Sequence, residues 1–318
     1  MYKIALIGNI HEDGVKLLKK YKFSLNFIRN FSKKNLINKL KNIDGIALRT
    51  SKLDKSILQE CKKLKIISRH GVGVDNIDVN FTNKKKITIL ITGNSNSASV
   101  AEHVISMFLN LCKNSFIADK LVRSNNFRKK YEMSPSYELY QKNIFIIGFG
   151  RIGKSLSKRC NAFESNVLVY DPYVDKKTIK KNNCIPINFN QGIKKADFIS
   201  IHLPLTKKTK YLITKKHLTK MKKTCIIVNT SRGSIIKEKD LYWALSKKII
   251  HSAGLDVFET EPPLKNNPLF KLNNIIFSPH NAALTEECKR RMGVETCQNL
   301  INYFFNKKKI KKNNFLNT

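Results

Sequence analysis

The sequence lacks the features that would place this protein in a membrane, export it or build it around a metal. No apolar run approaches the ~20 residues that a membrane-spanning helix needs. The opening MYKIALIGNI resembles a strand and lacks the charged, apolar and small-residue order of a signal peptide. The seven cysteines include no CxxC pair and no cluster with histidine. We therefore expect reduced thiols, no bound metal, no membrane partner and a cytoplasmic location.

Acidic residues are scarce as well, with 23 Asp and Glu against 60 Lys and Arg, which gives a formal charge of +37. A charge of this size can bind a nucleic acid by neutralising its phosphates. Here the basic residues are mostly Lys, spread along the whole chain and accompanied by abundant Asn and Ile, as an AT-rich coding sequence would produce at replaceable surface positions. We therefore expect no specific nucleic-acid partner, and a general attraction for small anions.

Short apolar runs alternate with helix-length segments along the whole chain, which is typical of parallel sheets covered by helices. The first series is KIALIG, DGIALR, KIISR and ITILIT; the second, from residue 143, is NIFIIGFG, VLVYD, DFISIHL, CIIVNT, HSAGLDV and NIIFSPH. A length of 318 residues also favours two domains. The predicted fold class is α/β, with two doubly wound domains: residues 98–286 form a Rossmann domain inserted in a flavodoxin-like domain made of 1–97 and 287–318.

A glycine-rich turn, GFGRIG, follows the strand-like run NIFII. In such a loop the first glycine permits the turn, the second lets the backbone approach a pyrophosphate and the third lets helix pack on strand. The next run, VLVYD, ends in Asp171, and 171 − 148 = 23 residues, close to the ~20 expected for a carboxylate that binds a ribose diol. That carboxylate would repel a 2′-phosphate, so NAD is favoured over NADP.

The same stretch also satisfies the phosphate-loop pattern GxxxxGK[ST], through Gly148, Gly153, Lys154 and Ser155. A nucleotide triphosphatase is therefore an alternative, and a glycine turn that binds nothing is another. A triphosphatase would need Lys154 at the phosphates and an Asp on magnesium. The only Asp on the adjacent strand is Asp171, which lies in a dinucleotide-like YDP. The pattern therefore favours a dinucleotide.

Three later motifs carry the chemistry: NTSRG (229–233), DVFETEP (256–262) and SPHNA (278–282). With GFGRIG, RHGVGVDNID (69–78) and ASVAEH (98–103), they resemble the D-isomer-specific 2-hydroxyacid dehydrogenase family over essentially the whole chain, most closely its phosphoglycerate dehydrogenases. The resemblance implies an NAD-dependent oxidoreductase whose active site lies between the substrate and NAD domains, and a homodimer formed by the NAD domains. The chain departs from the commonest pattern in having Asn281-Ala282-Ala283 after His280, where the family frequently has a glycine. It also ends without a regulatory domain, which argues against feedback control by serine.

Carried over by position, the resemblance makes His280 the acid/base, Glu261 its partner and Arg232 the cation that orients the substrate. An imidazole titrates near neutral pH and can take the hydroxyl proton, a carboxylate can fix its tautomer, and a guanidinium fork can bind the substrate carboxylate. Taken singly, each residue has an ordinary interpretation as a strand-end histidine, a salt-bridged arginine or a loop carboxylate.

The remaining predicted site residues bind cofactor or substrate. Only ten of the 60 basic residues are Arg, so a site that has Arg instead of Lys is informative. A planar guanidinium group can bind two phosphate oxygens at once. The alternative is that Arg49 and Arg69 pair with Asp44 or Asp75. We expect the cofactor to contact Gly148, Gly150, Arg151, Ile152, Gly153, Asp171, His202, Leu203, Pro204, Thr230, Ser231 and Asp256, and the substrate to contact Arg49, Arg69, Gly71, Val72, Gly73 and Arg128. His70, His103 and His251 have weaker claims.

The reaction implied is the oxidation of 3-phosphoglycerate to 3-phosphohydroxypyruvate, a step of serine biosynthesis. A glyoxylate, hydroxypyruvate or D-lactate-type reductase is an alternative on the same scaffold. A non-enzymatic, corepressor-like module that binds the dinucleotide is an alternative of another class, although the Arg, Glu and His of the three motifs would then be unexplained.

Overall fold

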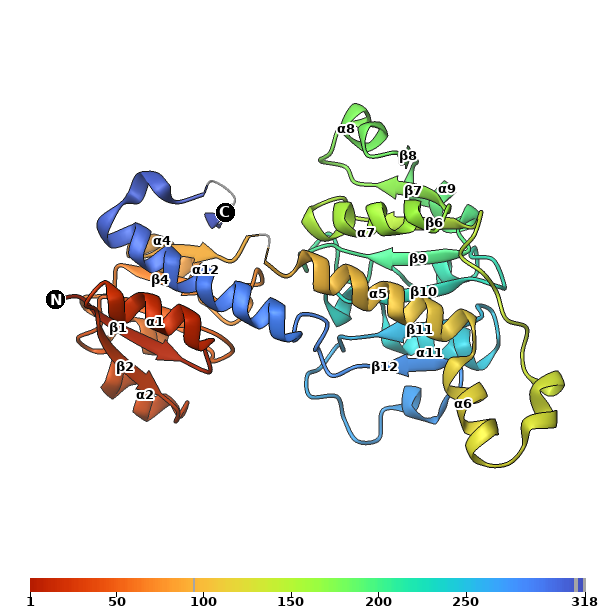
Figure 1. The fold of residues 1–318 in the computed structure, drawn as a ribbon, viewed down its shortest axis with the longest axis horizontal. Helices are drawn as coiled ribbons and strands as arrows, with labels where there is room; N and C mark the ends of the chain where they lie inside the picture. Colours follow the sequence, from red (N-terminus) through yellow and green to blue (C-terminus); the bar gives the residue numbers. More distant parts are fainter. Residues whose placement is uncertain (94, 312–313, 317–318) are drawn as a thin grey trace. The chain divides into compact units, whose positions relative to one another are not determined.

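The computed structural model describes residues 1–93, 95–311 and 314–316 (Figure 1). The chain divides into a smaller unit, Met1–Asn96 with Leu284–Thr318, and a larger unit, Ser97–Ala283. Each unit has its own parallel sheet, so the prediction of two doubly wound α/β units is confirmed.

The smaller unit is built on a five-stranded parallel sheet in the order β2-β1-β3-β4-β5, which is the flavodoxin-like order. The strands are β1 (Lys3–Ile7), β2 (Ser24–Ile28), β3 (Gly45–Leu48), β4 (Ile66–Arg69) and β5 (Thr88–Ile91). The helices are α1 (Glu12–Lys20), α2 (Lys33–Leu40), α3 (Lys55–Leu58), α4 (Val79–Lys84), α12 (Glu286–Phe305) and the short η4 (Lys307–Lys309).

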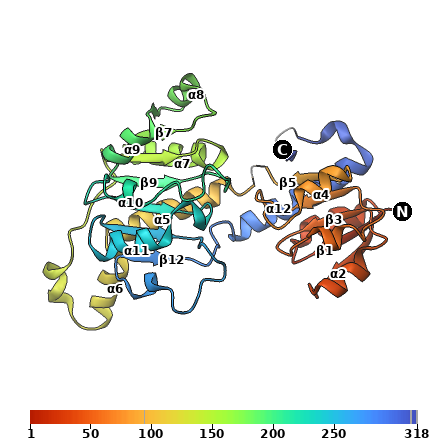
Figure 2. The same ribbon diagram turned by 180° about the vertical axis from the view of Figure 1, so that it is seen from behind.

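Both faces of this sheet are buried because successive strand residues point to opposite sides. In β1, Ile4 and Leu6 pack with the buried residues of α1 and α12, whereas Ala5 and Ile7 pack with those of α2 and α3. This explains why the strands are apolar without alternation, as expected for a sheet covered on both faces. Figures 1 and 2 show the two helical layers from opposite sides.

The larger unit has a seven-stranded parallel sheet in the order β12-β11-β10-β9-β6-β7-β8, the Rossmann arrangement. The strands are β6 (Asn143–Ile147), β7 (Asn166–Tyr170), β8 (Ile185–Pro186), β9 (Phe198–Ile201), β10 (Ile226–Asn229), β11 (Ser252–Leu255) and β12 (Ile275–Phe277). The helical segments are α5 (Ser97–Cys112), α6 (Ser115–Arg123), η1 (Phe127–Glu132), α7 (Arg151–Ala162), α8 (Lys176–Lys181), α9 (Phe189–Lys195), α10 (Lys215–Leu218), η2 (Gly233–Ile235), α11 (Glu238–Ser246) and η3 (Pro268–Lys271).

Helices cover both faces of this sheet too. Buried residues of α5 and α7 form one apolar cluster with one set of strand side chains, and α9, α10 and α11 form another with the alternate set. In β6, for example, Ile144 and Ile146 belong to the first cluster and Phe145 and Ile147 to the second. The carboxyl ends of these strands therefore meet at one edge, where an open parallel sheet presents its ligand crevice.

No helix in the described part of the chain is long and apolar enough to cross a membrane. The cysteines are buried, and none of them forms a disulfide bond. Within residues 1–93, 95–311 and 314–316, no group of three or more His, Cys, Asp or Glu side chains is arranged to hold a metal ion.

Candidate active site

Three adjacent strands of the larger sheet bring the predicted catalytic residues together. Arg232 follows β10, Glu261 lies in the loop after β11, and His280 follows β12. Because β10, β11 and β12 are neighbours in the sheet, their carboxyl ends are side by side although the residues are far apart in sequence. The three motifs therefore converge at one edge of a single rigid element.

His280 and Glu261 form a close pair in which the ring Nδ1 lies 2.8 Å from the carboxylate Oε2. The carboxylate can only accept, so Nδ1 carries a proton in either charge state of the ring, and Nε2 is the nitrogen that gains or loses the second proton. The hydrogen bond to Glu261, with the charges of Glu261 and Asp256, raises the pKa of His280, while burial and the charge of Arg232 oppose the shift. Burial alone would raise the pKa of Glu261, but His280, the Phe258 amide and Arg232 together lower it. The two groups thus favour an imidazolium–carboxylate pair.

The turn that carries Arg232 is held by hydrogen bonds to the side chain of Asn229, a fully buried residue at the end of β10. Its Oδ1 accepts hydrogen bonds from Ser231 N (3.0 Å) and Oγ (2.8 Å), and its Nδ2 donates to Arg232 O (2.9 Å). The Arg232 guanidinium donates to Ser231 O at 2.6 Å. The positive charge of Arg232 lowers the pKa values of both Glu261 and His280.

Gly233 joins this turn to the loop that carries Glu261. A Cβ on Gly233 would lie only 1.9 Å from the carbonyl carbon of Phe258, so no other residue fits without displacing that backbone. The amide of the same residue, Phe258, donates a hydrogen bond to Glu261 Oε1 at 3.1 Å. The glycine of NTSRG is thus required for the close approach of this turn to the Phe258 backbone.

The carboxylates of Glu238 and Glu259 stabilise the same loop by hydrogen bonds. These two residues were not identified from the sequence. Glu238 N donates to Glu259 Oε1 at 2.7 Å, and Glu259 N donates to Glu238 Oε1 at 2.5 Å. Asn267 Nδ2 adds a hydrogen bond to Glu238 Oε2 at 3.0 Å. Glu259 lies inside the DVFETEP motif, which was a signal for it, whereas nothing local marks Glu238.

The glycine-rich turn lies between β6 and α7, beside β9, at the point where the strand order reverses. Gly148 has φ +97° and a Cβ there would lie 2.5 Å from His202 O, while a Cβ on Gly153 would lie 2.2 Å from Gly148 O. A Cβ on Gly150 would meet nothing within 4 Å, and Gly150 caps α7 without a side-chain hydrogen bond. The loop therefore leaves open space in front of helix N–H groups, which suits a pyrophosphate.

Asp171, directly after β7, closes the other side of this turn. Its Oδ2 accepts a hydrogen bond from Phe149 N (2.7 Å) and its Oδ1 accepts one from Tyr173 N (2.8 Å). Each oxygen retains a lone pair for a ribose hydroxyl. The carboxylate is therefore held by the glycine-rich turn itself, at the position a dinucleotide-binding Asp requires.

Other predicted cofactor residues surround the same edge. His202, Leu203 and Pro204 follow β9, and Thr230 and Ser231 follow β10. The ring of His202 accepts or donates at Nε2 to Ser200 Oγ (2.8 Å), and burial lowers its pKa to about 3, so the ring is neutral. Among the described residues, neither His202 Nδ1 nor Thr230 Oγ1 has a hydrogen-bond partner. Buried polar atoms without partners suit a ligand that supplies them. The helix-start residues Arg151 and Ile152 are partly buried beside the loop.

The predicted substrate residues are divided between the units. In the smaller unit, Arg49 follows β3 and Arg69 ends β4; Arg49 Nη1 donates to Asn9 O at 3.4 Å, and Arg69 Nη1 donates to His70 O. Asp44 precedes β3, so it lies at the opposite sheet edge from Arg49 and cannot be its partner. Gly71 N donates to Thr92 Oγ1 at 2.9 Å.

Gly71 has φ +134° and, with the partly buried Val72 and Gly73, continues the chain after β4. Arg128 belongs to the larger unit, where it is exposed in η1.

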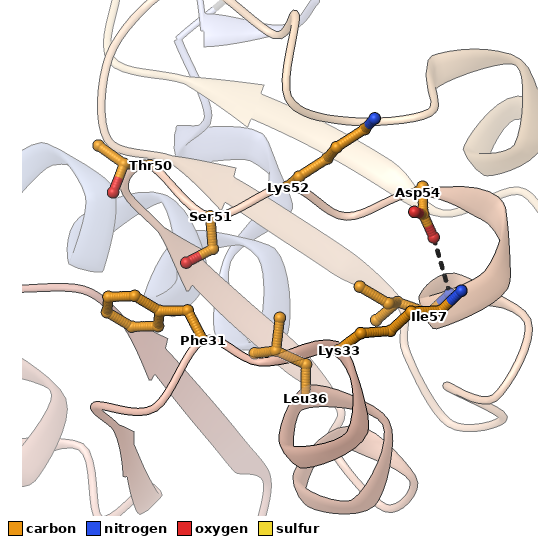
Figure 3. Close-up of a pocket in the computed structure, with 8 residues that line it drawn as sticks. All are labelled: Phe31, Lys33, Leu36, Thr50, Ser51, Lys52, Asp54 and Ile57. Atoms are coloured by element: carbon orange, nitrogen blue, oxygen red, sulfur yellow. Dashed lines mark hydrogen bonds between the residues drawn. The ribbon is translucent and has the colours of Figure 1, made fainter. Parts of the chain in front are cut away.

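A cavity of about 340 Å³ also opens in the smaller unit, between α2 and the segment that follows β3 (Figure 3). None of the predicted site residues lines it. Asp54 there caps α3 through a 3.2 Å hydrogen bond from Ile57 N, and the Lys52 ammonium is directed away from the Ser51 hydroxyl. Its lining residues are Phe31, Lys33, Leu36, Thr50, Ser51, Lys52, Asp54 and Ile57.

Comparisons with known proteins identify the family to which this chain is similar. Residues 105–282 match the model of the D-isomer specific 2-hydroxyacid dehydrogenase NAD binding domain. Over 296 residues, 92% of this chain, it is 38% identical to a D-3-phosphoglycerate dehydrogenase of Methanocaldococcus jannaschii, of which it spans 56%. The chain thus spans just over half the length of such relatives.

Shorter relatives are covered almost completely. A glyoxylate reductase of Thermococcus litoralis is 33% identical over 94% of this chain and 92% of its own length. Among solved structures, D-lactate dehydrogenase from Aquifex aeolicus, complexed with NAD and lactic acid, has a TM-score of 0.89 and 29% identity, with 98% of each chain covered. This chain therefore belongs to the D-isomer-specific 2-hydroxyacid dehydrogenase family.

Proposed function

We propose that this enzyme oxidises 3-phosphoglycerate to 3-phosphohydroxypyruvate, with Arg232, Glu261 and His280 as its catalytic residues. The observation that carries the catalytic roles is the 2.8 Å His280–Glu261 pair, in which the carboxylate raises the pKa of His280 and so stabilises the imidazolium that forms when Nε2 accepts a proton. A bound nicotinamide would supply the acceptor for the hydride that leaves the substrate's 2-carbon.

The roles of the side chains follow from their geometry. His280 Nε2 takes the proton of the 2-hydroxyl group as the C–H bond breaks, and the charge on the resulting imidazolium is stabilised by Glu261. Arg232 binds the substrate carboxylate through its fork and polarises the 2-oxygen. In the opposite direction His280 returns the proton to the 2-oxygen. Asp171, with the turn from Gly148 to Gly153, holds the dinucleotide.

The choice of a phosphorylated substrate rests on Arg49 and Arg69. Both are partly buried at the carboxyl ends of β3 and β4, and Arg49 stands beside β1, where the order of the smaller sheet reverses. Such a switch point is where an open α/β sheet binds its ligand, and paired guanidinium groups suit a phosphate. Relatives named D-3-phosphoglycerate dehydrogenase, 36–38% identical to this chain, agree with that choice.

The second candidate is a glyoxylate or hydroxypyruvate reductase, because relatives with those names match over more than nine tenths of their own length. The test compares kcat/KM for 3-phosphoglycerate with that for glycerate, glycolate and lactate, and repeats it with Arg49→Ala and Arg69→Ala. A phosphate site predicts a strong preference for the phosphorylated acid that both variants lose. Arg290→Ala, which removes an exposed ion pair with Asp13, is the matched control.

Equal or better use of the unphosphorylated acids by the wild type would assign the reductase function instead. NAD binding without turnover of any acid would favour the corepressor-like alternative.

We also propose that the enzyme is a homodimer that associates through α6 and η1. Neither segment contains a buried residue, and four of their aromatic or aliphatic side chains are more than 60% exposed: Phe116, Val122, Phe127 and Tyr131. Exposed apolar surface of this kind marks an interaction site. Light scattering should give twice the chain mass for the wild type and the chain mass for a Phe116→Asp, Phe127→Asp variant; a monomeric wild type would refute the proposal.

A further inference from the structure

The loop that carries His280 is held by a buried carboxylate that is not part of the catalytic pair. Asp256, after β11, is 1% exposed. Its Oδ1 accepts hydrogen bonds from Ser278 Oγ (2.5 Å) and Asn281 N (2.9 Å), and its Oδ2 accepts one from Ala282 N (3.2 Å). Its backbone oxygen accepts from His280 N at 2.8 Å. Asp256 therefore binds the loop on both sides of His280.

This loop needs external support because His280 has φ +52°. A left-handed conformation is uncommon for a residue with a large side chain and persists only where the surroundings impose it. In this conformation the ring Nδ1 of His280 lies 2.8 Å from Glu261 Oε2. Loss of the Asp256 contacts would therefore release both the strained backbone and the orientation of the imidazole.

A histidine on helix α5 also lies near the carboxylate of Asp256. His103 lies on α5, and its Nε2 is 2.9 Å from Ser278 Oγ and 3.8 Å from Asp256 Oδ1. Ser278 has one hydroxyl hydrogen, and it must point at Asp256 because a carboxylate cannot donate. The Ser278 oxygen therefore accepts from His103, which requires a proton on His103 Nε2. The hydrogen bonds run in one direction, from His103 through Ser278 to Asp256.

We propose that His103 is a positioning residue for His280, acting through Ser278 and Asp256. By donating to Ser278 Oγ, it fixes the hydroxyl so that its hydrogen points at Asp256 Oδ1. Asp256 then holds the amides of Asn281 and Ala282 in the geometry that presents His280 to Glu261. This inference rests on the proposed acid/base role of His280.

The test compares His103→Leu, which removes the donor, with His103→Gln, whose amide Nε2 can still donate to Ser278. We expect His103→Leu to lower kcat by roughly tenfold to 10²-fold, because small misplacements of a catalytic group have effects of that size. KM for NAD should stay constant, and the pH midpoint of kcat should fall as His280 leaves Glu261. His103→Gln should keep most of the wild-type kcat and a pH midpoint close to that of the wild type. Ser106→Ala, an exposed position one turn along α5, is the control.

A second comparison asks whether His103 acts through Ser278 or independently of it. It uses the single variant Ser278→Ala and the double variant His103→Leu, Ser278→Ala. If His103 acts through Ser278, the double variant loses no more activity than the more damaging single variant. Additive losses, or equal losses in His103→Leu and His103→Gln with an unchanged pH midpoint, would make His103 merely structural. His280→Ala is the reference: wild-type turnover in it would refute the proposed function, whereas an inactive His280→Ala beside a wild-type-like His103→Leu would refute this inference alone.

Discussion

Replacing Glu261 by Gln tests whether the charge of this carboxylate stabilises protonated His280. The substitution changes one carboxylate oxygen to an NH2 group. His280 Nδ1 and Phe258 N both donate to the Glu261 carboxylate. A glutamine has one carbonyl oxygen, so it can satisfy only one of these donors, and it carries no charge. The imidazolium of His280 therefore loses its stabilising partner while the loop stays nearly isosteric.

The size of the effect follows from the exposure of the pair. Two unit charges about 4 Å apart interact by about 1 kcal/mol in water and about 4 kcal/mol near a protein surface. The side chains of His280 and Glu261 are 51% and 38% exposed, so solvent screening puts the pair near the lower value, about 1 to 1.5 kcal/mol. Loss of this interaction should therefore lower the pKa of His280.

The assay is the pH dependence of kcat/KM in both directions. Oxidation needs neutral His280, so in the wild type it rises with pH through a midpoint above the ordinary histidine pKa, and reduction falls through the same midpoint. In Glu261→Gln both midpoints should move toward lower pH, because the pKa of His280 falls. Glu102→Gln, an exposed position on α5, should leave them unchanged. A midpoint that stays in place or rises in Glu261→Gln would refute the electrostatic reasoning.

The remaining predictions concern the proton carrier, the cofactor and the fold of the site. His280→Ala should lower kcat by roughly 10²–10⁴-fold while NAD binding, followed by fluorescence, is retained; near-wild-type turnover would remove His280 from the mechanism. Asp171→Ala should narrow the preference for NAD over NADP in kcat/KM, because no fixed negative charge then faces the 2′-phosphate. Equal use of both cofactors by the wild type would contradict the role of Asp171. Gly233→Ala should lower the stability by about 1–3 kcal/mol, seen as a lower Tm, because its Cβ would overlap the Phe258 carbonyl 1.9 Å away. An unchanged Tm would mean that the Phe258 backbone moves freely, and Glu261 would then not be rigidly placed.

The sequence alone determined the fold class, the cofactor and the types of residue in the site. The central strands are continuous apolar runs because both faces of each sheet are covered, so they stand out locally. The spacing from Gly148 to Asp171 indicates a dinucleotide because the chemistry of phosphate and ribose needs those residues at the ends of two successive strands. No comparable local pattern marks β2 or β8, which were absent from our expectations. Both lie at sheet edges, and β8 has only two residues.

Tertiary structure alone decided which side chains meet. The order β12-β11-β10 places His280 beside Glu261, and that order results from how each crossover packs on the sheet, not from any one segment. The 2.8 Å pair, the reciprocal Glu238–Glu259 hydrogen bonds and the contact of His103 with Ser278 join residues 19, 21 and 175 positions apart. Such contacts depend on buried neighbours from several elements. The sequence therefore names the chemical groups, and the packing of the sheet sets their geometry and their pKa values.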